Sequence, residues 1–327
     1  MKNLISNFAA QLATATEIAG HTVLTASPEE IRNVVICGMG GSGIGGNIAA
    51  ELAAPGSPVP ITVVKDYFLP GFVNENTLFI ASSYSGDTEE TIHALEEATR
   101  KNAHIVCITS GGQVRAIAER SGLDLFLIPS GLPPRAALGY SLTQLLCALE
   151  FHRIIPGSYQ KQINGAILLL SQEENNIIRS AKESALVLKD RIAVIYGTAG
   201  MESVALRFRQ QINENSKALC WHHVFPELNH NEIQGWRIEN EQLAVVIFRN
   251  GNDYIRTAKR IDVTAGILEH YSTPIIEIFS KGDSPLARTL YLIHWGDWVS
   301  YFIAEFKGLD TMDISVIRYL KSELAKL

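Results

Sequence analysis

One short sequence pattern occurs twice in the chain. Residues 34–43 read VVICGMGGSG and residues 193–202 read AVIYGTAGME, and each is a β-rich run that reaches a glycine and leads into a helical pattern. A strand, a glycine turn and a helix in this order are typical of parallel α/β sheets. A chain of 327 residues is long enough for two domains of ordinary size. The repeat therefore predicts two similar three-layer α/β domains.

Further strand and helix patterns fill both halves of the chain. We expect strands at residues 34–37, 61–64, 78–81, 105–109 and 125–128, and again at 192–196, 243–248 and 275–278. Helical periodicity predicts helices at residues 44–52, 89–100, 113–120, 162–188, 202–211, 254–269 and 286–306. Pro156 and Gly157 interrupt the pattern, so we place the boundary there, with an N-terminal domain at 1–153 and a C-terminal domain at 154–327.

The first glycine-rich turn indicates an anion site. Gly38, Gly40 and Gly43 form a GxGxxG pattern between a strand and a helix, and Asp66 lies at the end of the next predicted strand, just after residues 61–64. Glycines let main-chain N–H groups approach a phosphate or carboxylate at the start of a helix. The same pattern is found in dinucleotide-binding domains, so a dehydrogenase is an open alternative. A tight turn without a ligand is another.

A second loop discriminates among these alternatives. Residues 82–91 read SSYSGDTEET, follow a predicted strand and open a predicted helix. Ser83, Ser85 and Thr88 surround Gly86, and their hydroxyls with the helix N–H groups make a neutral cradle for one phosphate. A dinucleotide site does not require such a cradle. The structural alternative is helix capping, because Asp87 and Glu90 have the spacing of a cap and serine and threonine are common at helix starts.

The two loops together resemble the signature of sugar-isomerase (SIS) domains. Four later blocks extend the resemblance: LPPRAALGYS at 132–141, NENSK at 213–217, ELNHNEIQGW at 227–236 and IRYLK at 317–321. In this order they resemble the bifunctional phosphoglucose/phosphomannose isomerase family over nearly the whole chain. The resemblance implies two SIS domains, each a parallel sheet flanked by helices. It also implies interconversion of glucose 6-phosphate, and of mannose 6-phosphate, with fructose 6-phosphate, without a cofactor.

The resemblance also implies roles for individual residues. It makes Ser83, Ser85 and Thr88 the phosphate ligands and places Gly41 and Ser42 beside the sugar. Arg135 then faces the reacting carbons, Glu214 is the base that transfers the proton, and His230 opens the ring. Lys321, near the chain end, is the last implied site residue. A hydroxyl that favours mannose phosphate aligns with either Thr311 or Ser315. The implied assembly is a homodimer in which His230 reaches the site that holds the partner chain's base.

These residue types suit the implied chemistry. Isomerisation needs a group that opens the sugar ring, a base that moves a proton between carbons 1 and 2, and a charge that stabilises the enediolate. Histidine titrates near neutral pH, a tuned carboxylate such as that of Glu214 can shuttle the proton, and Arg135 supplies a fixed positive charge. The alternative for each of these charged or titratable residues is an exposed surface position with no catalytic role. His222 and His223 are adjacent and show no metal-ligand spacing, so we expect no metal.

Charge and hydropathy narrow the remaining choices. The net charge is −6 with no basic block, which argues against nucleic acid as a partner. The longest apolar runs fall short of the ~20 residues that a membrane span needs, and we expect a cytoplasmic protein. A sugar phosphate is the expected small-molecule partner. Another SIS-type isomerase and a non-catalytic sugar-phosphate sensor stay open as alternatives.

Overall fold

The computed structural model describes residues 1–237 and 239–326 of the chain. It contains two compact units, each built around its own parallel sheet. The N-terminal unit comprises Ser6–Gln172 and Lys281–Tyr291. The C-terminal unit comprises Met1–Ile5, Glu173–Ser280 and the chain from Leu292 onward. Contacts thus divide the chain inside the long helix α7 (Tyr159–Leu188). The domain limit at residues 153 and 154, placed from Pro156 and Gly157, stays a proposal.

The N-terminal unit is a five-stranded sheet in the order β2-β1-β3-β4-β5, with all neighbours parallel. Its strands are β1 (Asn33–Cys37), β2 (Ile61–Val64), β3 (Thr77–Ser82), β4 (His104–Thr109) and β5 (Asp124–Leu127). Its helices are α2 (Phe8–His21), α3 (Gly40–Ala53), α4 (Glu89–Arg100), α5 (Gly112–Ser121) and α6 (Leu138–Phe151), with a 3₁₀ turn η1 (Pro134–Ala136). Both sheet faces are covered, which explains why the strands read as continuous apolar runs.

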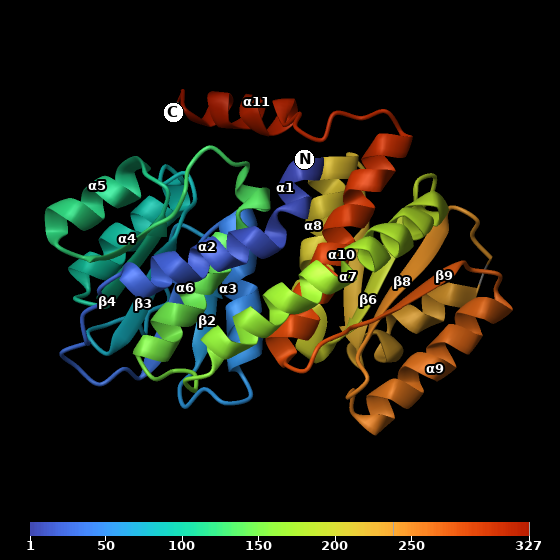
Figure 1. Ribbon diagram of the computed structural model, residues 1–327, viewed down its shortest axis with the longest axis horizontal. Coiled ribbons are helices and arrows are strands. Elements are labelled where there is room, and N and C mark those ends of the chain that lie inside the picture. Colours follow the sequence, from blue (N-terminus) through green and yellow to red (C-terminus); the bar gives the residue numbers. More distant parts are fainter. Residues whose placement is uncertain (238, 327) are drawn as a thin grey trace. The chain divides into compact units, whose positions relative to one another are not determined.

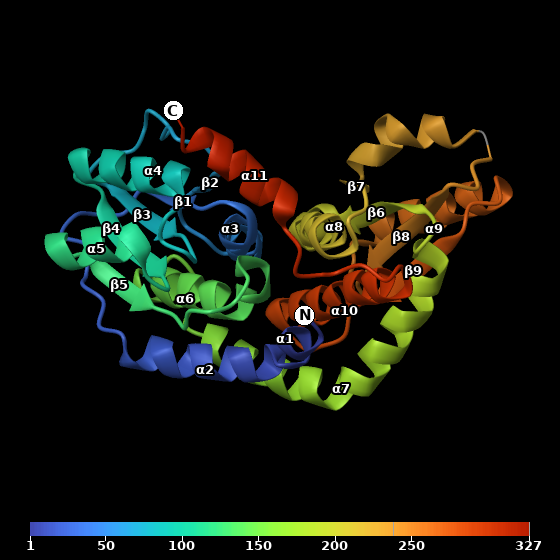
Figure 2. The ribbon, with the colours of Figure 1, turned by 90° about the horizontal axis from the view of Figure 1, so that it is seen from above.

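The two faces of this sheet carry different helices (Figures 1 and 2). Val35 and Phe79 face α4 and α5 in one apolar core, together with Leu95 and Val114 from those helices. On the other face α3 packs so closely on β1 that a Cβ at Gly46 would lie 2.9 Å from the Ile36 side chain. Helices α2 and α3 each contact α6.

The C-terminal unit has four parallel strands in the order β7-β6-β8-β9. These are β6 (Ile192–Thr198), β7 (Trp221–Phe225), β8 (Leu243–Arg249) and β9 (Ile275–Phe279). Its helices are α1 (Lys2–Ser6), α8 (Glu202–Ser216), α9 (Ile255–His270) and α11 (Ser315–Leu324). Its 3₁₀ turns are η2 (Ala199–Met201), η3 (Glu227–His230) and η4 (Glu232–Arg237). Helix α10 (Pro285–Phe306) begins in the N-terminal unit and continues into this one.

Aromatic packing fixes one face of the second sheet. Phe208 of α8, Phe248 of β8 and Trp295 of α10 form a triangle with ring centroids 5.5 to 5.9 Å apart. The opposite face packs on α9 and on the segment after β7, through a core that includes Leu228 and Trp236. Among the described helices, none combines the length and apolar character needed to cross a membrane. The prediction of two parallel sheets flanked by helices is confirmed.

Several features of the fold were not predicted from the sequence. Helices α1, α2 and α6 and strand β7 were absent from the expected elements. Helix α8 also continues past Gln211, where we expected it to end, as far as Ser216. The extension matters for function because it places Glu214 within the helix, in its last turn.

Candidate active site

Strand order in the N-terminal unit marks where a ligand binds. Strands β1 and β3 are neighbours, yet the helices that follow them, α3 and α4, lie on opposite faces of the sheet. Such a change in winding direction opens a crevice at the carboxyl ends of the two strands, which is where open α/β sheets bind ligands. Both predicted anion loops begin at these strand ends, after Cys37 and Ser82.

The first loop is shaped by the approach of another main-chain segment. Helix α3 begins at Gly40, earlier than expected, so Gly41 and Ser42 lie in its first turn. A Cβ on Gly41 would lie 2.7 Å from the carbonyl group of Pro134 and 2.9 Å from the nitrogen of Arg135. Only glycine permits this contact. The glycine therefore brings the segment that carries Arg135 against the start of α3.

The second loop places its hydroxyls at different depths. Ser83 is 1% exposed, and its hydroxyl donates to Thr88 Oγ1 at 3.1 Å and accepts from the Gly86 N–H at 3.2 Å. Ser85 is exposed and Thr88 is half-buried at the N-cap of α4. Asp87 does not cap α4, because its carboxylate accepts from the Gln113 N–H at 3.0 Å. The hydroxyls of Ser85 and Thr88 thus stand beside the unpaired N–H groups of a helix start.

Tyr84 ties this loop to its two neighbours. Its main-chain N–H donates to the Ser42 hydroxyl at 3.0 Å. Its own hydroxyl donates to the Pro129 carbonyl at 3.0 Å and accepts from the Leu132 N–H at 2.8 Å. The side chain is 8% exposed. One residue therefore joins the first turn, the second loop and the approach to Arg135.

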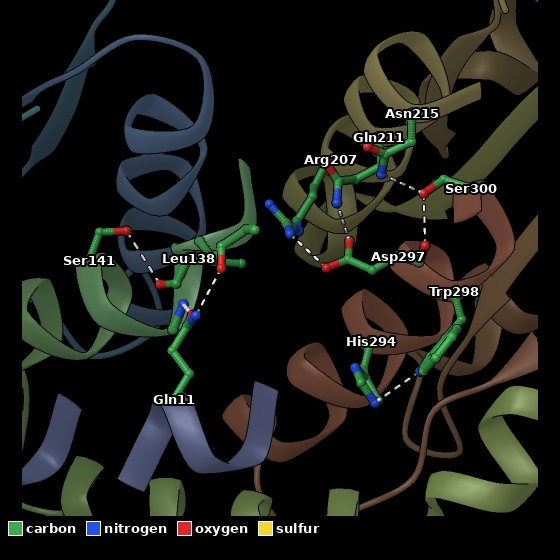
Figure 3. A network of polar contacts seen from close by, with 12 residues as sticks. Gln11, Leu138, Ser141, Arg207, Gln211, Asn215, His294, Asp297, Trp298 and Ser300 are labelled. Carbon is green, nitrogen blue, oxygen red and sulfur yellow. Dashed lines mark hydrogen bonds and ion pairs between the residues drawn. The ribbon is translucent and has the colours of Figure 1, made fainter. Parts of the chain in front are cut away.

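Arg135 lies in the 3₁₀ turn η1 and is 4% exposed. The next residue is held from α2, since the Gln11 side-chain amide donates to the Ala136 carbonyl at 2.8 Å. The Gln11 carbonyl oxygen in turn accepts from the Gly139 N–H at 2.7 Å, at the start of α6 (Figure 3). A buried guanidinium on a segment fixed from both sides is a preorganised positive charge.

Polar contacts with α10 hold the helix that carries Glu214 (Figure 3). Arg207 and Gln211, one turn apart on α8, donate to the two carboxylate oxygens of Asp297 at 2.7 and 2.9 Å. One turn further on, the Asn215 amide donates to the Ser300 hydroxyl at 3.0 Å. Because residues four apart lie on one helix face, these bonds fix the rotation of α8 and of its last turn.

The chain beyond α10 is joined to the end of α8 by Lys217. This residue has a φ of +52°, and its ammonium group donates to the carbonyls of Glu214 at 2.5 Å and Asp313 at 2.8 Å. The two candidate hydroxyls differ in this region: Thr311 is buried, whereas the exposed Ser315 donates to the Asp313 carboxylate at 3.2 Å.

The remaining two predicted residues are exposed. Lys321 lies on α11, where none of the described residues is buried. His230 ends the 3₁₀ turn η3, which follows β7 and extends beyond it in gold in Figure 2. Around this turn, Leu228 is buried and the Asn229 amide donates to the Thr264 hydroxyl at 2.9 Å. The turn is therefore anchored while its histidine points to the surface.

The side chain of Glu232 fixes the chain just after His230. The carboxylate of Glu232 accepts from the Tyr196 hydroxyl at 2.5 Å and from the Trp221 indole N–H at 3.0 Å. The Trp236 indole N–H donates to the same Tyr196 hydroxyl at 2.8 Å. Burial and the bond to Glu232 raise the pKa of Tyr196, which keeps it neutral as a donor. The segment that presents His230 is held rigidly on both sides.

Glu214 and His230 lie at opposite edges of their sheet. Helix α8 follows β6 and returns to the amino edge, where β7 begins, and β7 runs parallel to β6 toward η3 at the carboxyl edge. The five residues of β7 span about 16 Å. Within the C-terminal unit of one chain, these two side chains are thus separated by roughly the length of a strand.

Comparison with known proteins identifies the family. A protein of Caldicellulosiruptor bescii named bifunctional phosphoglucose/phosphomannose isomerase is 38% identical over 99% of this chain and 98% of its own. A protein of the same name from Thermoplasma volcanium is 39% identical over 89% of this chain and 91% of its own. The chain belongs to the bifunctional phosphoglucose/phosphomannose isomerase family. This confirms the resemblance inferred from the two loops and the four later blocks.

Two family models agree with this assignment, and a solved structure shares the fold. The SIS domain model matches residues 29–126, and the model of the bacterial phospho-glucose isomerase C-terminal SIS domain matches residues 177–324. A protein structure from Clostridium difficile 630, named provisionally as a phosphosugar isomerase, has a TM-score of 0.77 at 18% identity. It covers 98% of this chain and 97% of that one, and it shows the shared fold. The two-SIS-domain prediction is confirmed.

Residues that position the family's site were missed in the sequence. Tyr84 stands in the middle of the SSYSGDTEET block, where its place between two serines was a signal. No signal in the sequence pointed to Gln11, because its partners at Ala136 and Gly139 are more than a hundred positions away. Lys217 closes the NENSK block, and only its left-handed backbone and distant carbonyl partner reveal its part.

Two histidines, His222 and His223, lie shortly before the family's ELNHNEIQGW block, which contains His230. Burial, with Arg209 and His223 nearby, lowers the pKa of His222 to about 4. His222, His223 and His230 do not form a group of three ligating side chains within the described residues. The expectation of metal-free chemistry stays a prediction.

Proposed function

We propose that this chain interconverts glucose 6-phosphate and mannose 6-phosphate with fructose 6-phosphate. The observation that carries the proposal is the junction made by Tyr84, which joins the hydroxyl-rich loop to Ser42 and to the segment leading to Arg135. A phosphate cradle and a buried positive charge are thus fixed together at the ligand-binding end of one sheet. Family membership supports the same substrates.

The cradle suits a terminal phosphate on a neutral sugar. Ser85 and Thr88 offer hydroxyls beside the start of α4, whose N–H groups and helix dipole favour an anion. Ser83 shapes the loop from inside through its bonds to Gly86 and Thr88, in addition to its proposed role as a ligand. Gly41 and Ser42 would stand beside the sugar at the neighbouring helix start.

The chemistry requires only proton transfers. His230 takes a proton from a sugar hydroxyl and returns one to the ring oxygen, which opens the ring. Glu214 removes the proton from carbon 2 and delivers it to carbon 1, and the hydroxyl proton passes from the oxygen on carbon 2 to the oxygen on carbon 1. Arg135 stabilises the enediolate between these steps. Lys321 completes the charged groups of the site. The substrate and product are isomers, so the balance needs no external oxidant or reductant.

A coupled assay tests this activity. Purified protein is given fructose 6-phosphate alone, and glucose 6-phosphate and mannose 6-phosphate are measured after quenching by separate detection reactions. We expect both products, and we expect the same rate after prolonged dialysis against a strong chelator. Formation of neither product would refute the proposal, and loss of activity that returns with zinc would refute its metal-free chemistry.

We also propose that the active form is a homodimer with shared sites. Glu214 and His230 lie at opposite edges of one sheet, and His230 is exposed on a segment that extends beyond β7. A two-fold dimer lets the His230 of one chain serve the site that holds the partner chain's base, and it forms two equivalent sites. In such a dimer Glu214 of one chain and His230 of the other can act on the same substrate, although the two residues are far apart within one chain.

Subunit exchange tests the shared site. Glu214→Gln and His230→Ala, each inactive alone, are dissociated and reassociated in equal amounts. Half of the dimers are mixed, and one of the two sites in each mixed dimer carries neither change, so about 25% of wild-type activity returns. Two equal amounts of the same variant form the matched control. No recovery after mass spectrometry has confirmed exchange would refute the arrangement.

The preference for mannose phosphate depends on a hydroxyl for which two candidates remain. Thr311 is buried and Ser315 is exposed near the start of α11. Thr311→Val and Ser315→Ala are compared by the ratio of mannose to glucose phosphate formed from one fructose 6-phosphate sample. The variant that lowers this ratio identifies the residue, and an unchanged ratio in both would remove both from this role.

A further inference from the structure

Two histidines and an aspartate meet at the edge of the first sheet that faces away from the candidate phosphate loops. His104 is the first residue of β4, Asp124 is the first residue of β5, and His152 follows the last residue of α6. Strands β4 and β5 are parallel neighbours, so their first residues lie at the amino edge. The phosphate loops follow the carboxyl ends of β1 and β3. We call the three residues the His–Asp cluster.

The side chains of the His–Asp cluster converge. One ligand atom from each residue can be chosen so that all three lie within 4.8 Å of one another. His104 Nε2 is 3.9 Å from Asp124 Oδ2, and the two imidazole rings meet edge to face with centroids 4.8 Å apart. The side chains of His104 and Asp124 are 12% and 7% exposed.

The cluster leaves polar atoms buried without partners. The Nε2 atoms of His104 and His152 are both buried, and neither has a hydrogen-bond partner among the described residues. Buried polar atoms in folded proteins nearly always have a partner, and an exception calls for a bound water or ion. Two such atoms, on side chains that converge with the Asp124 carboxylate, point to a shared ligand.

Asp124 is held in place from outside the cluster. The Thr25 main-chain N–H donates to Asp124 Oδ2 at 2.8 Å, and the Thr25 hydroxyl donates to Oδ1. Metal-binding carboxylates commonly carry such supporting hydrogen bonds, which fix their orientation. The residue that faces the two imidazoles is therefore already oriented.

We infer that His104, Asp124 and His152 bind a divalent transition metal ion, with Zn²⁺ the best fit, and that a water completes a four-coordinate site. Two imidazole nitrogens and a carboxylate oxygen are a common ligand set for zinc, whereas calcium and magnesium prefer oxygen ligands alone. Ligands of a tetrahedral zinc lie about 3.4 Å apart, given bonds of about 2.1 Å. The ligand atoms lie up to 4.8 Å apart, so rotation of the side chains must bring them up to about 1.4 Å closer.

The position of this site predicts a structural role. It joins the starts of two strands to the end of α6, at the sheet edge opposite the candidate phosphate loops. An ion bound there stabilises the N-terminal unit without touching the proposed substrate. The inference is independent of the proposed function, because isomerisation should proceed with or without the ion.

Metal binding is tested with untagged protein stripped by a chelator and then dialysed. Co²⁺ is titrated as a spectroscopic probe, and Zn²⁺ is titrated by calorimetry. We expect one ion per chain, visible absorption bands typical of four-coordinate Co²⁺, and a rise in melting temperature of about 2–5 °C with saturating Zn²⁺. Absence of Co²⁺ absorption and of Zn²⁺ binding in the wild-type protein would overturn the inference.

Variants assign the ion to the cluster. We expect His104→Gln and His152→Gln to weaken Zn²⁺ binding at least about tenfold, because each removes one of three ligands. His21→Gln, at an exposed position on α2, is the matched control and should bind like the wild type. X-ray absorption of the zinc-loaded wild-type protein should show two imidazole ligands, which does not depend on how the variants fold. Equal affinity in all three variants, or zinc held without imidazole, would overturn the assignment.

Discussion

Removing the hydroxyl of Tyr84 tests whether the loop junction controls the reaction. In Tyr84→Phe the ring stays in place, and the main-chain bond to the Ser42 hydroxyl is kept. Two bonds are lost, the one donated to the Pro129 carbonyl and the one accepted from the Leu132 N–H. Burial raises the pKa of the Tyr84 hydroxyl, so it is neutral and able to make both bonds near neutral pH.

The size of the effect follows from these two bonds. Each contributes about 0.5–1.5 kcal/mol net, so together they favour the ordered conformation of the segment before Arg135 by about 1–3 kcal/mol. If this segment must be ordered in the transition state, kcat/KM falls by about 5–150-fold. We expect most of the loss in kcat, because Arg135 is proposed to act on the enediolate and the phosphate loop keeps its other contacts.

Steady-state kinetics with fructose 6-phosphate, together with inhibition by inorganic phosphate, separate the two effects. The inhibition constant for phosphate should change by less than about twofold, because the cradle at Ser85 and Thr88 is intact. Tyr301→Phe is the matched control, since its hydroxyl bonds to the exposed Glu305 at 2.7 Å. A Tyr84→Phe enzyme with the kcat/KM of this control would refute the reasoning.

Four further changes test other parts of the structure. Glu214→Gln should lower kcat by about 10²–10⁴-fold with little change in KM, because it removes the proposed base but keeps its size; steady-state rates measure this, and near-normal turnover would contradict it. Gly86→Ala should raise KM about tenfold or more, because residue 86 has a φ of +75° and an added Cβ would lie 1.8 Å from a main-chain oxygen; an unchanged KM would contradict it. Asp297→Asn should lower the free energy of unfolding by about 3–5 kcal/mol, because it breaks a buried pair with Arg207; an unshifted urea midpoint would contradict it. The pKa of His222 is lowered from 6.5 to about 4, so stability present above pH 6.5 is lost as the pH falls toward 4; His222→Phe should flatten this loss in acid denaturation, and an identical profile would contradict it.

Elements that depend on near neighbours were predicted closely. Strand β2 and helix α4 have the predicted bounds, Ile61–Val64 and Glu89–Arg100. In α4 the buried positions recur with the helical period, and Thr88 and Arg100 mark its ends. The two anion loops were likewise identified locally, because glycines and hydroxyls at a strand end specify such loops by themselves.

Elements whose conformation depends on distant contacts were missed. Helix α6 is buried on nearly all sides, so its sequence lacks the polar face that reveals a helix. Strand β7 has two central histidines and is defined by pairing with β6. The last turn of α8 contains poor helix formers, and the bonds from Asn215 and Ser216 to Ser300 hold it in place.

The fold class, the family and the types of side chain that carry the proposed chemistry could be predicted from the sequence, because these depend on patterns within a few dozen residues. How those side chains are held depends on contacts that form only in the folded chain. Gly41 against Pro134, and Tyr84 against Leu132, are contacts between segments far apart in the chain. The same applies to the convergence of His104 and His152. Such contacts arise when packing brings strand ends to a common edge, and no local pattern in a single sequence encodes them.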